Sequence, residues 1–535
     1  MSKLRTLIGR GIRKLRLFSR IWIKNREVSS HAQTSPDLRP VVFFNASARI
    51  EALNLNAAFQ LLTSWGVQLA GREVHYFACQ AGMKQCVLGA GLGDPQDPPP
   101  CQDCIAHTRL FTGSAAADWF VYQEDPQLGD LLAGSSLEEL QSLVYQGRPL
   151  GELVLPSLRW ILRRHHLEDN SLTRYLFTAY LLSAHSIAEQ ASLMLAEINP
   201  EVVVVFNGLQ YPEAVVRWVA QQAGIRVITH EVNLRPFSAF FTAGQATIYP
   251  MDIPDDFQLS PAQDRVLDGY LAKRFQGDFK MAGVKFWSDM DHLPGDLLDF
   301  AAGFKGIIPV FTNVIFDTSQ AHANTIFPDM FAWLDLVYEA ARKHPEQLFV
   351  IRAHPDEMRA GKSSRESVMS WAEKRGISAQ ANVILIGPDE TLSSYELIQR
   401  SKFTMVYNSS IGLEASLLGS PVLCAGKARY TQYPTVFFPA STAEYQETLE
   451  RFLEEDQIQV PPEFVINARR FLYFQLYRTS IPFDEFLVEH PSPGYVQLKD
   501  FTWKKLLPGG SRTIDCVVSG ILGEKSFILE TDEGL

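Results

Sequence analysis

The sequence has no apolar run long enough to span a membrane, and it has few cysteines for its length. A spanning helix needs roughly 18 or more consecutive apolar residues, and every apolar run in these 535 residues is shorter. Six cysteines do not make a disulfide framework in a chain of this size. The N-terminal region also lacks the continuous hydrophobic stretch and small-residue cleavage site of a signal peptide. These absences predict a cytoplasmic protein that is not integral to a membrane.

The chain also lacks the basic surface that nucleic-acid binding requires. Residues 1–26 contain nine Lys or Arg and no acidic residue, so the formal net charge of −11 divides into +9 for this segment and −20 for the rest. An acidic body opposes binding to a polyanion. The sequence therefore predicts no nucleic-acid partner.

The basic N-terminal segment has the pattern of an amphipathic helix. Apolar side chains recur at steps of three and four from Leu4 to Trp22, and basic side chains fill most of the remaining positions. This pattern is typical of a helix that lies on anionic lipid. We therefore expect a protein held peripherally on the inner face of the cell membrane. An organelle presequence and a helix docked on the protein's own body are the two alternatives.

In the second half of the chain, polar residues directly follow apolar strands. Residues 349–357, F-V-I-R-A-H-P-D-E, predict a buried strand that ends near Arg352 and His354. Residues 403–426 predict a strand, a tight turn at Ser409 and Ser410, a helix and a further strand. Ligands of a parallel sheet bind at the carboxyl ends of its strands. The two turns are thus expected to face one crevice.

The start of this predicted helix has the features of an anion site. Free backbone N–H groups and the positive dipole end attract a phosphate, and Gly412 leaves room for close approach. A plain helix N-cap is the alternative for Ser409 and Ser410, and a simple turn is the alternative for His354-Pro355. Glu414 is suited to hydrogen-bonding a ribose hydroxyl, or else it is an ordinary helix-surface carboxylate.

These motifs resemble those of bacterial capsule and surface-polysaccharide glycosyltransferases of the GT-B type, including the Kdo-transferase-like and sialyltransferase-like groups. The similarity rests on the His-Pro motif at His354 and the Ser-rich motif at Ser409. Residues 307–318 resemble the family's strand ending in Asn-Val-x-x-Asp, and residues 202–208 resemble a strand of its N-terminal half. The resemblance covers roughly residues 202–430.

The length and the resemblance together imply an α/β, GT-B-like fold with two Rossmann-like domains facing a cleft, preceded by the amphipathic helix. A chain of 535 residues is too long for a single core. The expected segments are a membrane-surface helix at 1–26, a linker at 27–39, an acceptor-side domain at 40–295, a nucleotide-sugar-binding domain at 296–455, and helices returning to the first domain at 456–535.

The function implied by the resemblance is transfer of a sugar from a nucleotide-sugar donor to a bacterial surface glycan or lipid-linked acceptor. The expected donor-binding residues are Arg352, His354, Ser409, Ser410, Gly412 and Glu414. No Asp-x-Asp motif lies near the predicted cleft, so we expect no catalytic metal. A nucleotide-sugar epimerase of the same two-domain plan and a non-catalytic scaffold of glycan assembly are the alternatives.

The residue that activates the acceptor is expected at a strand end of the first domain. Residues 226–230 predict a strand that ends at His230 and Glu231, where a base would meet the acceptor. A capped turn explains the same two residues equally well. Residues 226–231 contain no acidic Asp-Gly or Glu-Asp-Gly motif of the kind that the sialyltransferase-like group uses for its base, so the resemblance itself identifies no base.

Four of the six cysteines fall in one Gly- and Pro-rich loop at 79–104. Four thiolates with a closing Cys-x-x-Cys fit a structural zinc site that would hold such a loop together. An iron–sulfur cluster uses the same ligands, and unrelated buried thiols are the plain alternative. The predicted metal ligands are Cys79, Cys86, Cys101 and Cys104.

Overall fold

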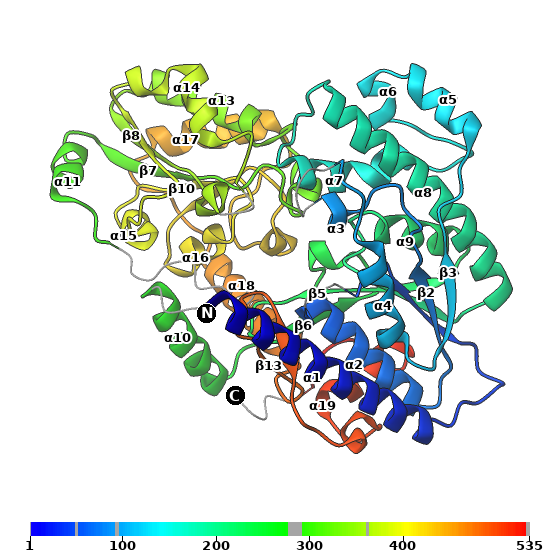
Figure 1. The fold of residues 1–535 in the computed structure, drawn as a ribbon. Coiled ribbons are helices and arrows are strands. Elements are labelled where there is room, and N and C mark those ends of the chain that lie inside the picture. The colour runs from blue at the N-terminus through cyan, green and yellow to red at the C-terminus, as the bar shows by residue number, and fades with distance from the viewer. Residues whose placement is uncertain (1, 49–51, 91–95, 277–290, 360–362, 531–535) are drawn as a thin grey trace.

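The computed structural model describes residues 2–48, 52–90, 96–276, 291–359 and 363–530, of which residues 2–16 and 89–90 are described by backbone only. The chain forms two α/β domains, each built on a mainly parallel sheet, and a small two-stranded ribbon (Figure 1). This confirms the predicted α/β class with two Rossmann-like domains.

The first sheet has seven strands in the order β12-β6-β5-β4-β1-β2-β3. Strands β5, β4, β1, β2 and β3 pair in parallel, whereas β6 pairs antiparallel with both of its neighbours, β5 and β12. The strands are β1 Val41–Asn45, β2 Val74–Cys79, β3 Ala116–Phe120, β4 Val202–Phe206, β5 Arg226–Val232, β6 Ser238–Thr242 and β12 Ile481–Pro482.

The second sheet has five parallel strands in the order β11-β10-β7-β8-β9. Its strands are β7 Gly306–Phe311, β8 Gln347–Arg352, β9 Val383–Ile386, β10 Thr404–Val406 and β11 Val422–Cys424. The ribbon consists of β13 Leu487–Glu489 and β14 Val496–Leu498.

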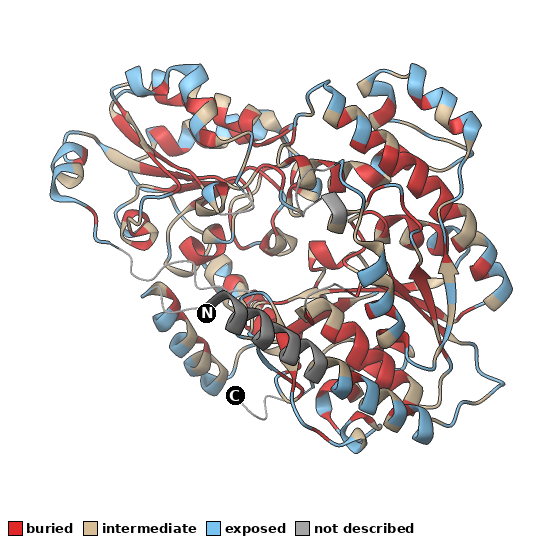
Figure 2. Ribbon diagram, viewed as in Figure 1, coloured by how far each residue is buried: buried red, intermediate tan, exposed pale blue. Residues whose placement is uncertain are grey.

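Helices cover both faces of each sheet, so the central strands are apolar on both sides. Phe43 of β1 packs with α2 and α19, whereas the next residue, Phe44, packs with α7, α8 and α9 on the opposite face. This burial on both sides is why β1 is a continuous apolar run rather than an alternating one. Figure 2 shows the buried residues concentrated along the strands and on the inward sides of the helices.

Eleven of the described α-helices precede β7 in the sequence, and eight follow it. Those that precede it are α1 Ser2–His31, α2 Leu55–Leu69, α3 Val87–Ala90, α4 Cys101–Thr112, α5 Pro126–Gly134, α6 Leu137–Gln141, α7 Leu150–Leu162, α8 Ser171–Ile198, α9 Glu213–Gln222, α10 Pro261–Phe275 and α11 Gly295–Ala301. Those that follow are α12 Gln320–Ala323, α13 Met330–Lys343, α14 Val368–Arg375, α15 Ser394–Gln399, α16 Ile411–Leu417, α17 Thr442–Glu454, α18 Pro462–Tyr473 and α19 Arg512–Ile521.

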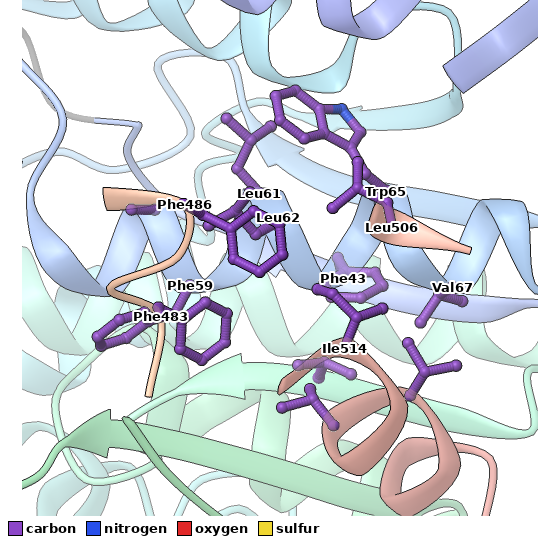
Figure 3. Packing of buried hydrophobic residues seen from close by; sticks show 14 of the residues in the cluster. Phe43, Phe59, Leu61, Leu62, Trp65, Val67, Phe483, Phe486, Leu506 and Ile514 are labelled. Atoms are coloured by element: carbon purple, nitrogen blue, oxygen red, sulfur yellow. The ribbon is translucent and has the colours of Figure 1, made fainter. Parts of the chain in front are cut away.

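The C-terminal segment crosses from the second domain back to the first. Helix α18 packs against α16, and the chain then adds β12 to the edge of the first sheet by pairing with β6. Phe483, Leu506 and Ile514 complete the core around Phe43 and Trp65 (Figure 3). The first domain therefore depends on residues more than 400 positions away for its core.

The N-terminal helix is longer than expected and its second half is docked. Helix α1 runs to His31, so the first five residues of the expected linker are helical. Ile21 and Val28 are buried in the first domain's core, and Asn25 accepts a hydrogen bond from the Trp65 indole at 2.7 Å. Residues 17–31 are thus docked on the protein's own body, which was one of the two alternatives to membrane binding. The side chains of residues 1–16 lie outside the described part of the structure. Within the described residues, no helix is both long and apolar enough to cross a membrane.

Candidate functional site

The carboxyl ends of both sheets face a cleft between the domains, and cavities lie along it. One of them, of about 520 Å³, extends from β1, β2, β4 and β5 of the first domain to Asp317 and Arg429 of the second. A cavity of about 320 Å³ lies at the ends of β7, β8 and β10, and one of about 200 Å³ lies beside it under Lys427. Asp317 lines all three cavities. We call the cavity of about 520 Å³ the first-domain cavity, that of about 320 Å³ the second-domain cavity and that of about 200 Å³ the side cavity.

Glu231 lies in the first-domain cavity, at the end of β5. Its carboxylate accepts hydrogen bonds from Asn56 at 3.2 Å, Asn207 at 2.9 Å and the backbone of Val232 at 2.8 Å. Burial raises the pKa of Glu231, and these three donors together with Arg429 oppose the rise. A carboxylate with a raised pKa, fixed by neutral amides and open to a cavity, has the properties of a general base.

Arg429 brings a cation from the second domain to this cavity. Its guanidinium lies 3.6 Å from the centre of the Tyr249 ring, and Tyr249 donates a hydrogen bond to the Val232 carbonyl. Burial raises the pKa of Tyr249, so its hydroxyl stays protonated. The stack therefore places a positive charge near Glu231, at the junction of the two domains.

The assignment of His230 to the site is wrong. Side chains alternate along a strand, so His230 and Glu231 lie on opposite faces of the sheet. The His230 ring is fully buried between Phe206 and Phe241 and lines none of the three cavities. Neither ring nitrogen has a hydrogen-bond partner in the described part of the chain. Burial lowers the pKa of His230 to about 3.

Replacement of His230 by Phe is expected to stabilise the protein, by about 1–3 kcal/mol at pH 7, because it removes two buried unpaired nitrogens. Folded His230 stays neutral to about pH 3, whereas the unfolded side chain takes up a proton below about pH 6.5. Wild-type stability is thus lost as the pH falls through this range, and the advantage of the variant should grow. Thermal melts from pH 7.5 to 4.5 measure it. A constant difference across this range would contradict the buried, neutral state.

His354 lies at the expected strand end and faces both the second-domain and side cavities. Its Nδ1 accepts a hydrogen bond from the Asp356 backbone at 3.1 Å, which we read as placing the proton on Nε2. Burial lowers the pKa of His354; Asp356 and Asp317 oppose this effect and Arg352 adds to it. The side chain is therefore a neutral N–H donor.

Ser409 and Ser410 lie beside His354 in the same two cavities. Ser410 begins α16 without a side-chain capping bond, and within the described residues neither serine hydroxyl has a hydrogen-bond partner. Both hydroxyls are therefore available to a ligand. Gly412 is buried instead, and a Cβ there would lie 2.2 Å from the Tyr430 hydroxyl. Packing against Tyr430, and not the close approach of a ligand, is what requires glycine at this position.

Two further expected donor ligands are engaged by the protein itself. Arg352 donates to the carbonyls of Leu392 and Glu390 and, at 2.8 Å, to the Ser394 hydroxyl, so it fixes the loop before α15. Burial lowers its pKa to about 10.

Glu414 is almost completely buried. It accepts a hydrogen bond from Arg274 at 2.6 Å and another from the Tyr395 hydroxyl. These contacts show that the carboxylate anchors Arg274 of α10. Both residues line the second-domain and side cavities, and contact of Glu414 with a ribose stays a prediction.

The four clustered cysteines line one wall of the first-domain cavity. Burial, together with the nearby thiols of Cys104, Cys86 and Cys101, raises the pKa of Cys79 to about 12. Among the described residues, however, they do not form a group of ligand atoms within 4.8 Å of one another. The structure thus shows a thiol-rich wall rather than a closed four-ligand site, and the metal stays a prediction.

Most of the residues that surround Glu231 in the structure are not among the site residues predicted from the sequence. Asn207 lies in the predicted strand segment 202–208 and Asp317 in the Asn-Val-x-x-Asp segment 307–318, but neither is among the predicted site residues. Asn56 lies in the first turn of α2, and Arg429 begins a short 3-10 helix of the second domain. Only the packing of the two domains brings Arg429 to the cavity of Glu231. Strand-end position was the one signal that could have drawn attention to Asn207.

Comparison with known proteins places the second domain in a family context. Residues 297–434 match the family described as "Capsule polysaccharide biosynthesis protein". This segment contains β7 to β11 and the strand-end residues that line the second-domain cavity. The match confirms the resemblance to capsule polysaccharide biosynthesis proteins for this segment.

The chain is also similar to Protein FixF of Sinorhizobium fredii, at 29% identity over 231 residues, or 43% of this chain. It spans about half the length, 49%, of that relative. Among solved structures, Thermosulfurimonas dismutans KpsC, "beta Kdo 2,4 transferase", aligns at 11% identity with a TM-score of 0.36, covering 56% of this chain and 84% of that one. The UDP-GlcNAc 2-epimerase of Neisseria meningitidis aligns at 14% identity with a TM-score of 0.24, covering 82% and 99%. Scores this low assign no activity to the chain.

Proposed function

We propose that this protein is a glycosyltransferase of capsule or surface-polysaccharide synthesis that uses a nucleotide-sugar donor. The observation that carries the proposal is the position of Glu231, a carboxylate of raised pKa open to the first-domain cavity. Neutral donors of the second domain line the adjoining cavity, and that domain carries the family match.

In this scheme the acceptor glycan occupies the first-domain cavity and the donor nucleotide occupies the second-domain cavity. Glu231 takes the proton of the acceptor hydroxyl as its oxygen forms the bond to the anomeric carbon of the donor sugar. The bond from that carbon to the phosphate oxygen breaks, and the nucleotide leaves with the added negative charge. His354, Ser409 and Ser410 are placed to donate hydrogen bonds to this phosphate, and Arg429 is placed to offset its charge.

A panel of nucleotide sugars, with and without glycan acceptor, tests the scheme. Nucleotide release that requires acceptor and yields a longer glycan supports transfer. A new sugar isomer formed without acceptor would identify an epimerase instead, and absence of nucleotide binding would leave a scaffold.

Replacement of His354 or Ser410 by Ala is expected to weaken nucleotide binding roughly tenfold or more. Each variant loses a hydrogen bond to an anion, which is worth about 1.5–3 kcal/mol. Calorimetric titration with the nucleotide measures the effect, and Glu231→Gln serves as a control whose nucleotide affinity should not change. Unchanged affinity in both alanine variants would remove the donor site from this cavity.

We further propose that α1 brings the enzyme to an anionic membrane surface on the cytoplasmic side. Trp22 and Ile23 are 53% and 49% exposed on the face of α1 turned away from the core, and Arg20 and Arg26 are exposed beside them. Exposed aromatic and basic side chains on one helix suit the interface of an anionic bilayer.

The double variant Trp22→Ser/Ile23→Ser is expected to bind liposomes of anionic lipid several-fold less than the wild type. These two side chains are chosen because they can be changed without opening the core that Ile21 and Val28 fill. Val144→Ser is the matched control, because Val144 is also an exposed apolar side chain, at 61%, and lies outside α1. Flotation at low and high salt measures binding, and equal flotation of the double variant and the wild type would show that α1 has another role.

A further inference from the structure

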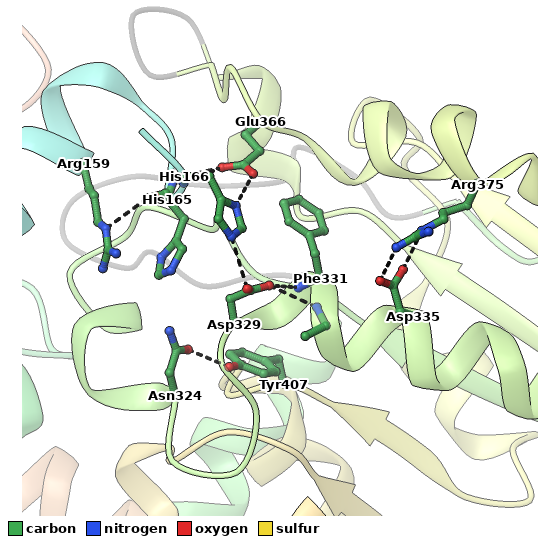
Figure 4. A network of polar contacts seen from close by, with 11 residues as sticks. Arg159, His165, His166, Asn324, Asp329, Phe331, Asp335, Glu366, Arg375 and Tyr407 are labelled. Carbon is green, nitrogen blue, oxygen red and sulfur yellow. Dashed lines mark hydrogen bonds and ion pairs between the residues drawn. The ribbon is translucent and has the colours of Figure 1, made fainter. Parts of the chain in front are cut away.

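A cluster of imidazoles and carboxylates joins the two domains away from Glu231. His165 and His166 follow α7 of the first domain, whereas Asp329 and Glu366 belong to the second (Figure 4). Within the described residues this is the one place where three potential ligand atoms, from His165, His166 and Asp329, lie within 4.8 Å of one another. No feature of the proposed transfer reaction uses these residues.

We propose that His165, His166 and Asp329 form a binding site for a divalent transition-metal ion of the zinc type, held between the two domains. Two imidazole nitrogens and one carboxylate oxygen are a donor set preferred by Zn²⁺ and Co²⁺ over Ca²⁺ or Mg²⁺. The His166 Nε2 and Asp329 Oδ2 atoms are 3.2 Å apart, a separation that two ligands of one tetrahedral ion can adopt.

His165 supplies the third donor of the set. The residue is 9% exposed, and in the described part of the chain its ring nitrogens make no hydrogen bond, so a ring nitrogen can take a ligand. Its backbone is held, because its N–H donates to Glu366 at 2.9 Å and its carbonyl accepts from Arg159 at 3.0 Å.

The surrounding residues hold the other two ligands as metal sites usually do. Glu366 lies 2.5 Å from Nδ1 of His166, and a carboxylate at that nitrogen orients the ring and leaves Nε2 for the metal. Asp329 caps α13 by accepting the N–H groups of Phe331 at 2.7 Å and Ala332 at 3.0 Å. The ligand positions are therefore fixed before an ion arrives.

Arg159 is the nearby cation of the cluster, and the carboxylates of Asp329 and Glu366 offset its repulsion of an incoming ion.

Titration of the metal-depleted full chain with Co²⁺ alone tests the proposal, because Co²⁺ spectra separate nitrogen and oxygen ligands from thiolates. The expected result is about one ion per chain with visible d–d bands and no thiolate charge-transfer band. His165→Gln and Asp329→Asn should each lower the affinity at least about tenfold, and Glu366→Gln about 10–100-fold.

Asp335→Asn is the matched control for Asp329→Asn. Asp335 lies on the same helix, pairs with Arg375 and is outside the cluster, so its replacement should leave the affinity unchanged. Asparagine also caps helices well, so Asp329→Asn keeps the start of α13. Absence of Co²⁺ binding, equal affinity in wild type and Asp329→Asn, or a spectrum of thiolate bands alone would overturn the proposal; the last result would place the ion on Cys79, Cys86, Cys101 and Cys104.

Discussion

Replacement of Glu231 by Gln is expected to lower the rate of sugar transfer by roughly 10²–10⁴-fold, the usual contribution of a general base. Glutamine keeps the shape of the side chain and its place beside Asn56 and Asn207, but it cannot accept the acceptor's proton. Acceptor-dependent nucleotide release measures the effect, and nucleotide affinity should be unchanged.

The pH dependence of the wild-type enzyme gives a second readout of the same carboxylate. Because burial raises the pKa of Glu231, the rate should fall on the acid side at a higher pH than for an ordinary carboxylate. Glu152→Gln, an exposed carboxylate on α7 of the same domain, is the matched control and should leave both rate and profile unchanged. Full activity of Glu231→Gln would remove Glu231 from the chemistry.

Replacement of Glu414 by Gln is expected to destabilise the protein by about 3–5 kcal/mol. The side chains of Glu414 and Arg274 are each only 7% exposed, and removal of one charge leaves the other buried without its partner. Tyr395 also loses a charged acceptor. Denaturant unfolding measures the change.

The exposed pair between Arg342 and Glu339 is the control for this effect. Both of its side chains are more than half exposed, so Glu339→Gln should change stability by about 1 kcal/mol or less. The double variant Arg274→Met/Glu414→Leu should recover much of the loss, because it leaves no buried charge unpaired. If Glu414→Gln and Glu339→Gln lost the same amount of unfolding free energy, burial would not be the reason that the Arg274–Glu414 pair matters for stability.

The strand-end argument identified residues that line the cavities, such as Glu231 and His354, but also His230, which lines none of the three described cavities, for a definite physical reason. Sequence shows where a strand ends but not how its last residues are turned. Glu231 and His230 were equal candidates, and the register of β5 puts only Glu231 in the cavity. Arg352 does line the second-domain cavity, but its guanidinium is directed to the loop before α15, a partner 40 residues away.

The sequence by itself determined the α/β class, the parallel strands at the core of the two sheets and the strand-end position of His354 and Ser409, because these follow from local apolar runs and the turns after them. Tertiary structure alone decided which side chains meet. It brought Arg429 to the cavity of Glu231, paired Glu414 with Arg274, and set His166 between two carboxylates of the other domain. Such pairings join residues more than 100 positions apart, and no local pattern encodes them, since they depend on how the two domains pack.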